Sequence, residues 1–386
     1  MKLFEVSIVI PCLNEARTLP DCIIRAKQVL VDNDLQGEII VADNGSTDGS
    51  REAALKLGVV LVAVATKGYG AALMGGIASA QGKYIIMGDA DGSYDFSQVM
   101  PFIEKLRAGQ DLVMGCRLPR GGGKIMPGAM PWKHRWIGNP VLTAIGRLFF
   151  KSPVSDFHCG LRSFTKQAYQ NMDLQTTGME FASEMVVKAS LKGMRIAEVP
   201  IILYKDGRLG RSHLKSWSDG WRHFRFMLLY SPRWLFFIPG LVLMSVGGIT
   251  GTILTITPVK IGTVTFDTNT LLASAIGMII GFQLLSFALF TKMFAIAEGL
   301  LPEDQQTRKI LDSLSLEAGL IIGLACSIVG FSVLVYALWY WRVHHFGSLS
   351  PAASLRIMIP GITILTLGVE ITFASFFLSI LRLKRR

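Results

Sequence analysis

The hydrophobic pattern divides the chain into two unlike parts. Up to about Pro232, short apolar runs alternate with segments of helical periodicity, whereas beyond Trp234 the sequence is apolar almost throughout. Apolar runs of about four to eight residues, bounded by glycine, proline or polar clusters, are typical of buried strands. The sequence therefore predicts strands at Glu5–Pro11, Gly37–Asn44, Val59–Val64, Lys83–Asp91 and Asp111–Arg117.

Near-continuous valine and isoleucine runs separated by helices indicate an α/β fold with a parallel sheet covered on both faces. Ligands of such sheets bind beyond the carboxyl ends of the strands. No GxGxxG follows the first strand, which disfavours a dinucleotide site. Polar residues gather at the predicted ends: Pro11 and Glu15, Asp43 and Asp48, Lys67 with Gly68 and Gly70, Asp89 and Asp91, and Arg117.

Two carboxylates, Asp89 and Asp91, end the fourth predicted strand. Side chains alternate along a strand, so the chain must turn here for both carboxylates to face one ligand, and Gly88 and Gly92 permit that turn. Mg²⁺ and Mn²⁺ prefer oxygen ligands and are commonly held by one or two carboxylates plus substrate phosphates. The pair predicts a divalent-metal site, with a solvated Asp-Gly turn as the alternative.

The apolar half contains four segments long enough to cross a bilayer, which needs about 20 apolar residues. Basic residues bias the orientation of such segments, because they are enriched in cytoplasmic loops. Arg308, Lys309 and the basic tail after Leu381 fall on the side of the N-terminal part, so both termini are predicted to be cytoplasmic. The predicted spans are Leu235–Thr257, Leu271–Thr291, Ala318–Trp341 and Ile357–Leu381.

Two features inside these spans have open interpretations. Gly247 and Gly251 form a GxxxG spacing, which either allows close helix approach or is simply tolerated. Glu370 places a carboxylate within the fourth span, where burying a charge costs free energy. Three interpretations stay open: a functional group, a protonated packing residue, or an ion-pair partner of Lys292.

Net charge and motif content limit the classes of molecule that this protein is expected to bind. The net charge of +11 suits an anionic membrane surface, a nucleotide or a phospholipid. No zinc-finger, basic-zipper or RNA-binding signature is present, so nucleic acid is not predicted as a partner. Five cysteines without a CxxC pair indicate reduced, buried thiols in a cytosol-facing protein.

Two basic segments are candidates for phosphate or membrane contacts. Gly115–Asn139 is rich in glycine and proline and is predicted to be a mobile loop, either simply solvated or clamping a second phosphate through its arginines. Between Arg208 and Trp234, aromatic and basic residues recur at helical spacing, which predicts an interfacial amphipathic helix. We therefore expect a catalytic domain at 1–207, an amphipathic linker at 208–233 and a four-helix membrane domain at 234–386.

The strings VSIVIPCLNE, VADNGSTDGS and DAD resemble the family-2 inverting glycosyltransferases of the GT-A (Rossmann-like) fold. The resemblance spans roughly Val6 to Trp234 and is strongest to the polyprenyl-phosphate glycosyltransferases, such as dolichyl-phosphate mannose or glucose synthases. Ser93 stands where the mannose synthases commonly have glutamine, which puts a third protein ligand and GDP-mannose in doubt. The resemblance implies nucleotide contacts from Pro11, Leu13, Glu15, Asp43, Lys67 and Asp89, and Mg²⁺ or Mn²⁺ on Asp89 and Asp91.

The resemblance also implies an acceptor side. Asp156 begins a D-x-x-x-G-x-R segment and is either a general base or a residue that orients Arg162 or the sugar, with Asp91, Arg117 and Asp156 forming the catalytic set. A phosphate acceptor is already largely ionised, so it needs little proton removal. Glu180 and Glu184 share one predicted helix face, with either a structural or a sugar-binding role. The implied acceptor-phosphate contacts are Arg117, Arg135, Arg162, Arg208, Ser212 and Lys215.

The activity implied is transfer of a sugar, with inversion, from a UDP- or GDP-sugar to undecaprenyl or dolichyl phosphate, making a lipid-linked monosaccharide for glycan assembly. Association of copies through the membrane helices stays open. One alternative is a processive polysaccharide synthase, but its QxxRW motif is matched only by Lys133-His134-Arg135-Trp136, which lacks the glutamine. Another is a non-catalytic membrane protein with a degenerate nucleotide domain, against which the intact acidic residues argue.

Overall fold

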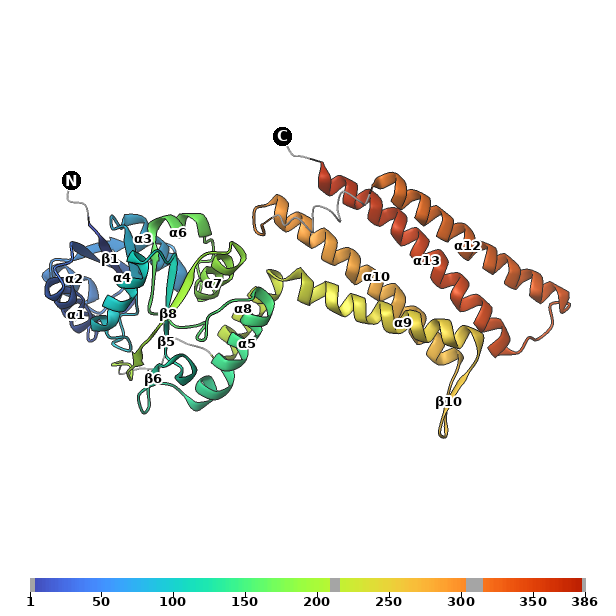
Figure 1. Cartoon of the computed structure of the whole chain (residues 1–386), viewed down its shortest axis with the longest axis horizontal. Coiled ribbons are helices and arrows are strands. Elements are labelled where there is room, and N and C mark those ends of the chain that lie inside the picture. The colour runs from blue at the N-terminus through green and yellow to red at the C-terminus, as the bar shows by residue number, and fades with distance from the viewer. Residues whose placement is uncertain (1–3, 209–215, 303–314, 384–386) are drawn as a thin grey trace. The chain divides into compact units, whose positions relative to one another are not determined.

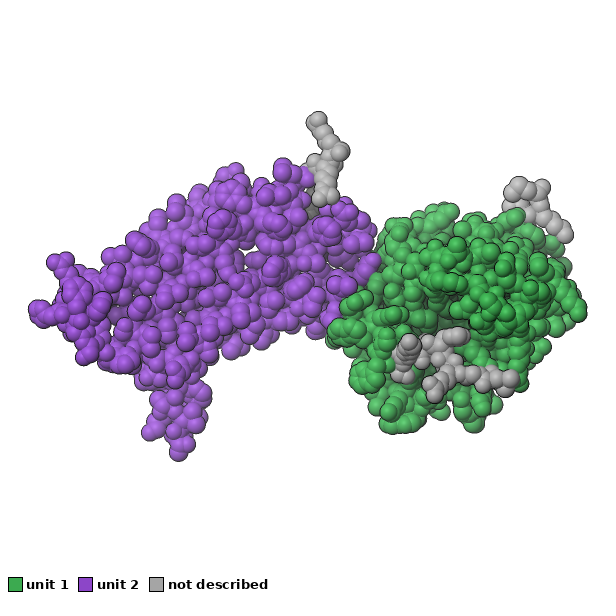
Figure 2. All heavy atoms as spheres, turned by 180° about the vertical axis from the view of Figure 1, so that it is seen from behind, with its two compact units in different colours: residues 1–227 green, residues 228–386 purple. Residues whose placement is uncertain are grey.

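The computed structural model describes residues 4–208, 216–302 and 315–383. Two compact units, residues 1–227 and 228–386, divide the chain within α8 (Ser216–Leu229) (Figures 1 and 2). The first unit contains a mixed α/β sheet and the second contains long apolar helices, so the predicted fold class is confirmed.

The first unit is built on a seven-stranded sheet of order β3-β2-β1-β4-β7-β5-β8. All five predicted strands are present, although the fourth ends at Met87, before the carboxylate pair. The expectation of a purely parallel sheet is wrong at β7, which runs antiparallel between β4 and β5. The strands are β1 (Val6–Cys12), β2 (Gly37–Asp43), β3 (Val60–Ala63), β4 (Tyr84–Met87), β5 (Leu112–Cys116), β7 (Arg162–Thr165) and β8 (Ile196–Pro200).

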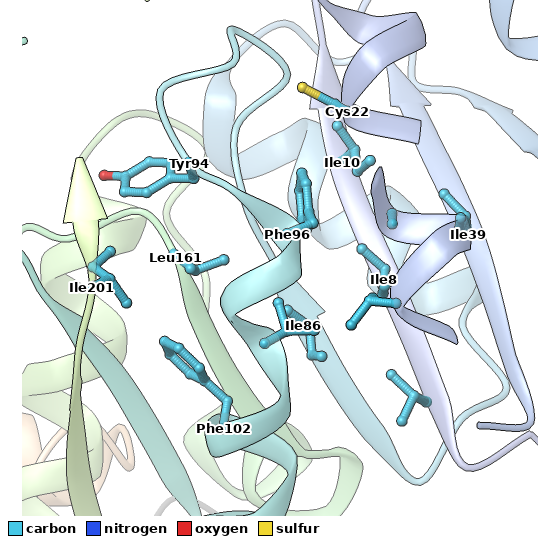
Figure 3. Close-up of a cluster of buried hydrophobic side chains, with 14 of the residues drawn as sticks. Ile8, Ile10, Cys22, Ile39, Ile86, Tyr94, Phe96, Phe102, Leu161 and Ile201 are labelled. Carbon is cyan, nitrogen blue, oxygen red and sulfur yellow. The ribbon is translucent and has the colours of Figure 1, made fainter. Parts of the chain in front are cut away.

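Helices cover both faces of the sheet, which explains why β1 is buried at every position. Ile8 and Ile10 join a buried cluster with side chains from α1, η1 and α4 (Figure 3). Val9 faces the other side, where a Cβ at Gly76 of α3 would come within 2.6 Å of it. The helices of this unit are α1 (Leu19–Asp32), α2 (Ser50–Lys56), α3 (Tyr69–Ser79), η1 (Phe96–Val99), α4 (Met100–Arg107), α5 (Asn139–Phe150), α6 (Lys166–Met172), α7 (Phe181–Leu191) and α8.

The segment 115–139 is not the irregular loop that the sequence predicted. It contains a short 3₁₀ turn, η2 (Pro119–Gly121), and a strand, β6 (Lys124–Ile125), which pairs in parallel with β9 (Ile202–Leu203). Its end is a π-helical turn, η3 (His134–Gly138), that continues into α5. Glycine and proline here mark turns between ordered pieces.

The second unit contains four helices that are long and apolar enough to cross a membrane, as judged by length and composition. Each includes most of one predicted span and extends beyond it at one or both ends. A hairpin, β10 (Val259–Ile261) and β11 (Val264–Phe266), follows the first helix. In Figure 1 the first and second helices lie side by side, and the fourth lies between the second and the third. They are η4–α9 (Arg233–Phe237 and Ile238–Ile256), α10 (Thr268–Ala297), α12 (Leu316–Val343) and α13 (Pro351–Arg382).

Contacts between these helices bear on both features. A Cβ at Gly247 would lie 2.6 Å from the carbonyl oxygen of Ser274 on α10, so close helix approach is what this glycine provides. At Gly251 the nearest atom would be 3.6 Å away, an ordinary contact. Glu370 accepts a hydrogen bond from Gln283 Nε2 at 2.7 Å, which joins α13 to α10 through a polar pair inside the apolar helices.

Gly247→Leu is expected to destabilise the helical unit by about 1–3 kcal/mol, because the new side chain would push α9 away from α10. Gly248→Leu is the matched control, since a Cβ at Gly248 meets no atom within 4 Å. Thermal midpoints of both variants in detergent measure the difference. Equal midpoints for the two variants would show that the α9–α10 contact does not depend on Gly247.

Candidate functional site

The reversal of β7 determines which residues meet at one edge of the sheet. Because β7 is antiparallel, its first residue, Arg162, pairs with Met87 at the carboxyl end of β4 and with Met114 in β5. The loop before β7, residues 156–161, therefore lies at the same edge as Asp89 and Asp91. The sequence placed these segments in one site by resemblance, and the register supplies the physical reason.

The loops after β1 and β2 are fastened to each other. Asn14, with a left-handed φ of 57°, accepts a hydrogen bond from Thr47 N at 2.8 Å. Ala16 N donates to Asp48 Oδ2 at 3.0 Å, and Glu15 N donates to Ser50 Oγ at 2.9 Å. Since left-handed backbone is favoured mainly by glycine, asparagine and aspartate, Asn14 suits this turn. The predicted nucleotide residues Leu13 and Glu15 thus belong to one ordered pair of loops, next to Pro11 at the buried end of β1.

Asp43 and Lys67 complete that surface. The buried Asp43 carboxylate accepts hydrogen bonds from Gly45 N and Ser46 N, both at 3.1 Å, which closes the turn after β2. Lys67 Nζ donates to the carbonyl oxygen of Asn44 at 2.6 Å. A Cβ at position 45 would collide with Lys67 Nζ, so Gly45 leaves the space that this ammonium group occupies. The structure therefore brings an acidic and a basic candidate together at adjacent turns.

The carboxylate pair is tightly enclosed. Tyr69 Oη donates to Asp89 Oδ1 at 2.9 Å, and a Cβ at Gly160 would lie 2.7 Å from Asp89 Oδ2. Asp91 Oδ1 accepts a hydrogen bond from Ser93 N at 2.9 Å. Desolvation and the neighbouring Asp91 charge raise the pKa of Asp89 to about 6. The raised pKa indicates that the positive charge around the Asp89 carboxylate does not fully offset its burial and the nearby charge of Asp91.

Arg208 supplies part of that counter-charge. Its Nε donates to Glu15 Oε1 at 2.7 Å, and its Nη1 lies 3.4 Å from Asp91 Oδ2. Backbone bonds from Tyr204 N to Ser93 O and from Gly207 N to Asp91 O, each 2.9 Å, hold this segment against the carboxylate turn. The structure thus places Arg208, predicted as an acceptor contact, beside two residues predicted to serve the donor. Ser212 and Lys215 lie outside the described residues.

The carboxylate pair fits a hard divalent cation. A cationic guanidinium already lies against Asp91, and carboxylate oxygens are the ligands that Mg²⁺ and Mn²⁺ prefer. Within residues 4–208, 216–302 and 315–383 there is no group of three or more His, Cys, Asp or Glu side chains arranged to hold a metal. The protein would therefore contribute two carboxylates, leaving the other positions to substrate phosphate and water.

Arg117 and Asp156 form a buried ion pair. Asp156 is fully buried and accepts from Arg117 Nε at 2.7 Å, from Arg117 Nη2 at 2.8 Å and from Arg117 N at 3.0 Å. A carboxylate engaged on both oxygens by an arginine is poorly suited to remove a proton. This geometry favours an orienting role for Asp156, toward Arg117 rather than Arg162, and argues against a general base.

Arg162 is placed where a phosphate does not reach. Its side chain is fully buried and donates to the carbonyl oxygens of Cys159 at 2.7 Å, Phe157 at 3.3 Å and Ala182. With all three nitrogens engaged by backbone, this arrangement favours a role in holding the loop before β7 over the acceptor contact that the resemblance implied. Arg135, in η3, remains partly exposed with its guanidinium 5.3 Å from the Trp136 ring.

Sequence reasoning missed two tyrosines of this edge. One is Tyr69, and the other is Tyr94, which is buried and whose Oη accepts hydrogen bonds from Gly160 N at 2.8 Å and Arg117 Nη1 at 3.4 Å. A tyrosine within the polar turn after Asp91 was the available signal. Of the two helix-face acids, Glu184 is a structural residue, because it is buried, ion-paired with Lys188 at 2.8 Å and bonded to Gln175 N and Thr176 N.

Two helices of this unit expose large apolar side chains. On α8 the exposed fractions of Trp217 and Trp221 are 93% and 57%. Trp136 in η3 is 66% exposed, and Val141 and Leu148 on α5 are exposed as well. α8 is the helix that the aromatic spacing predicted, whereas η3 lies in the segment predicted to be a loop and α5 follows that segment. Exposed tryptophans beside basic residues are typical of helices lying in a membrane interface.

Comparisons with known proteins agree with this architecture. The model of glycosyl transferase family 2 matches residues 7–172, and that of the glycosyltransferase family 2 C-terminal transmembrane region matches residues 289–382. The low-salt glycan biosynthesis hexosyltransferase of Haloferax volcanii is 36% identical over 97% of this chain and 88% of its own length. The dolichyl-phosphate hexose transferase of the same organism is 24% identical over 56% of this chain and 89% of its own length. Glucosyl-3-phosphoglycerate synthase from Mycobacterium tuberculosis is 20% identical in a structural match with a TM-score of 0.45, covering 58% of this chain and 79% of that one.

Asp156→Ala is expected to destabilise the first unit by about 3–5 kcal/mol, because it leaves the Arg117 charge buried without its partner. Glu5→Ala is the control: it breaks an ion pair with Arg107 that is largely exposed, and such pairs contribute less than about 1 kcal/mol. The readout is the urea midpoint of the purified protein in detergent. A wild-type midpoint for Asp156→Ala, combined with loss of activity, would return Asp156 to the role of general base.

Proposed function

This chain belongs to glycosyltransferase family 2, and on that premise we propose that it is a membrane-bound hexosyltransferase that moves a sugar from a nucleotide-sugar to a polyprenyl phosphate with inversion. The product would be a lipid-linked monosaccharide for glycan assembly. A cytosolic GT-A domain would perform the transfer, with the C-terminal transmembrane region anchoring it.

The observation that carries this proposal is the pairing of opposite charges at one edge of the sheet. Asp89 and Asp91 suit a cation-bound diphosphate, while Arg117 and Arg208 lie close by and suit a second phosphate. An enzyme joining a nucleotide-sugar to a phosphate acceptor must bring two anionic groups together, and it needs fixed positive charge to offset their repulsion. This arrangement meets that requirement.

The roles follow from the geometry. Asp43 and Lys67, fixed at neighbouring turns, would hold the nucleotide together with Pro11 at the end of β1 and with Leu13 and Glu15 in the loop that follows. Asp89 and Asp91 would hold Mg²⁺ or Mn²⁺, which when bound stabilises the departing nucleoside diphosphate.

Arg117, oriented by Asp156 through Nε and Nη2, would offer the remaining N–H groups of Nη1 and Nη2 to the acceptor phosphate. Arg208 could join it only after leaving Glu15 and Asp91. An ionised acceptor phosphate attacks the anomeric carbon directly, so no protein base is required and a single displacement inverts the configuration.

Membrane attachment supports a lipid acceptor rather than a soluble one. Four helices are suited to span a bilayer, and η3–α5 and α8 expose tryptophans that suit the interface. The relative named a dolichyl-phosphate hexose transferase is consistent with an undecaprenyl- or dolichyl-type carrier. The domain limits predicted from the sequence and the cytoplasmic position of both termini belong to the same proposal.

The direct test is transfer of labelled sugar from a panel of UDP- and GDP-hexoses to polyprenyl phosphate, followed into the organic phase. Asp91→Ala is expected to reduce transfer by at least about 100-fold, because a metal ligand contributes several kcal/mol to the stabilisation of developing charge. Asp21→Ala, an exposed aspartate on α1, should leave the rate unchanged. A chelator should abolish transfer, and added Mn²⁺ or Mg²⁺ should restore it.

Product analysis separates the alternatives. One sugar per lipid supports the proposal, whereas a growing polymer would indicate a polysaccharide synthase. No transfer from any donor by folded protein, over a range of lipid lengths, would leave the non-catalytic interpretation.

A further inference from the structure

Three polar side chains meet outside the carboxylate edge. Ser183 Oγ, on the first turn of α7, lies 2.8 Å from His223 Nδ1 on α8 and 3.3 Å from His158 Nε2 in the loop before β7. The two imidazole rings contact each other edge to face, with 4.6 Å between their centroids. Ser183 is fully buried and His223 is 8% exposed, so the cluster is an interior one.

His158 belongs to the loop that organises the candidate site. Two residues before it, Asp156 holds Arg117, and two residues after it, Gly160 lies against Asp89 and Tyr94. Arg162 fixes the carbonyl groups on both sides of His158. Any displacement of the His158 side chain is therefore passed on to a loop with little freedom.

The two helices with exposed tryptophans both reach this loop. α5 contacts Phe157: Thr143 Oγ1 accepts from Phe157 N at 3.3 Å, and a Cβ at Gly146 would lie 2.6 Å from the Phe157 ring. α8 contacts the next residue, His158, directly through the ring of His223 and indirectly through Ser183 of α7, which is bonded to both rings. The two helices thus contact successive residues of one loop through side chains other than their exposed tryptophans.

We propose that His158, Ser183 and His223 are positioning residues that hold the interfacial helix α8 in register with residues 156–161, the loop whose Asp156 orients Arg117. A phosphate carried at the bilayer surface would thereby be presented to the site. This inference rests on the proposed function, whose acceptor is embedded in the membrane. The three residues touch neither substrate nor metal, and they act through the loop.

The chemistry of the cluster fits a register-setting contact better than simple packing. Desolvation lowers the pKa of His223 to about 4 and that of His158 well below its ordinary value, so both rings are neutral. One hydroxyl can then donate to one ring and accept from the other, which fixes both ring orientations. Among the described residues, His158 Nδ1 is buried without a hydrogen-bond partner, a cost that an apolar side chain would avoid.

The first experiment compares two acceptors in matched variants. His223→Ala should raise the KM for a long-chain polyprenyl phosphate in liposomes by about tenfold, the effect of one lost buried hydrogen bond. It should change the KM for a short, water-soluble prenyl phosphate by less than about twofold. His223→Asn, which keeps a polar atom near the position of Nδ1, should restore most of the loss. Equal effects on both acceptors would overturn the proposal.

Ser183→Ala and Ser190→Ala form a second matched pair on α7. Both serines lie on one helix, but Ser190 Oγ has no hydrogen-bond partner among the described residues. Only Ser183→Ala should show the acceptor-dependent loss, and matching behaviour of the two variants would contradict the linkage.

Hydrogen exchange in the full-length, substrate-free protein supplies a readout that does not depend on transfer. His223→Ala should speed exchange in residues 156–162 and in α8 together, and unchanged exchange in the loop would overturn the linkage. If wild-type protein transfers no sugar, the proposed function fails, yet this measurement still tests the contact between helix and loop.

Discussion

The antiparallel course of β7 between two parallel strands is the constraint on which the rest of the site depends. A parallel strand in that place would have delivered its preceding loop to the opposite edge of the sheet. Because β7 is reversed, the loop that contains Asp156, His158 and Gly160 arrives beside the ends of β4 and β5. The buried guanidinium of Arg162, at the first position of β7, then fixes the loop by bonding to its carbonyl groups. Strand direction and one buried cation together create the acceptor side.

Charge balance is the second organising principle of this edge. Glu15, Asp89 and Asp91 gather on one side, while Arg117 and Arg208 compensate them in part. Arg117 is committed to Asp156, whereas Arg208 is shared between two carboxylates through a segment held by two backbone bonds. Burying charges is costly unless each is paired. A divalent cation on Asp91 would compete with Arg208 for that carboxylate, while the contact between Arg208 and Glu15 would remain.

The helical unit is stabilised by interactions different from those of the sheet unit. In an apolar environment, helices gain little from burying apolar surface against one another, so close backbone approach at Gly247 and the Gln283–Glu370 hydrogen bond have greater weight. The first unit instead depends on a sheet buried on both faces, with apolar side chains above and below β1. The two units are thus stabilised by different interactions, and the boundary between them in the sequence lies within α8.

The sequence by itself determined the elements whose signal is local. Continuous apolar runs predicted five strands and four long helices, since burial on both faces or in lipid leaves no polar position in the pattern. The glycine-flanked Asp89 and Asp91 predicted the acidic turn, and motif resemblance predicted the family. β7 was not predicted, because Arg162–Thr165 is short and contains buried polar residues. η3 was not predicted, because glycine and proline in residues 115–139 indicated a loop.

Tertiary structure alone decided which charges meet. Asp156 pairs with Arg117 across 39 positions, Arg208 reaches Glu15 across 193, and the His158–Ser183–His223 cluster joins three separate elements. Such pairings depend on strand order and direction, which no local pattern encodes. The same arginine type is therefore buried structure at Arg162 and candidate chemistry at Arg117, because the surrounding fold determines whether a guanidinium meets backbone carbonyls or an incoming phosphate.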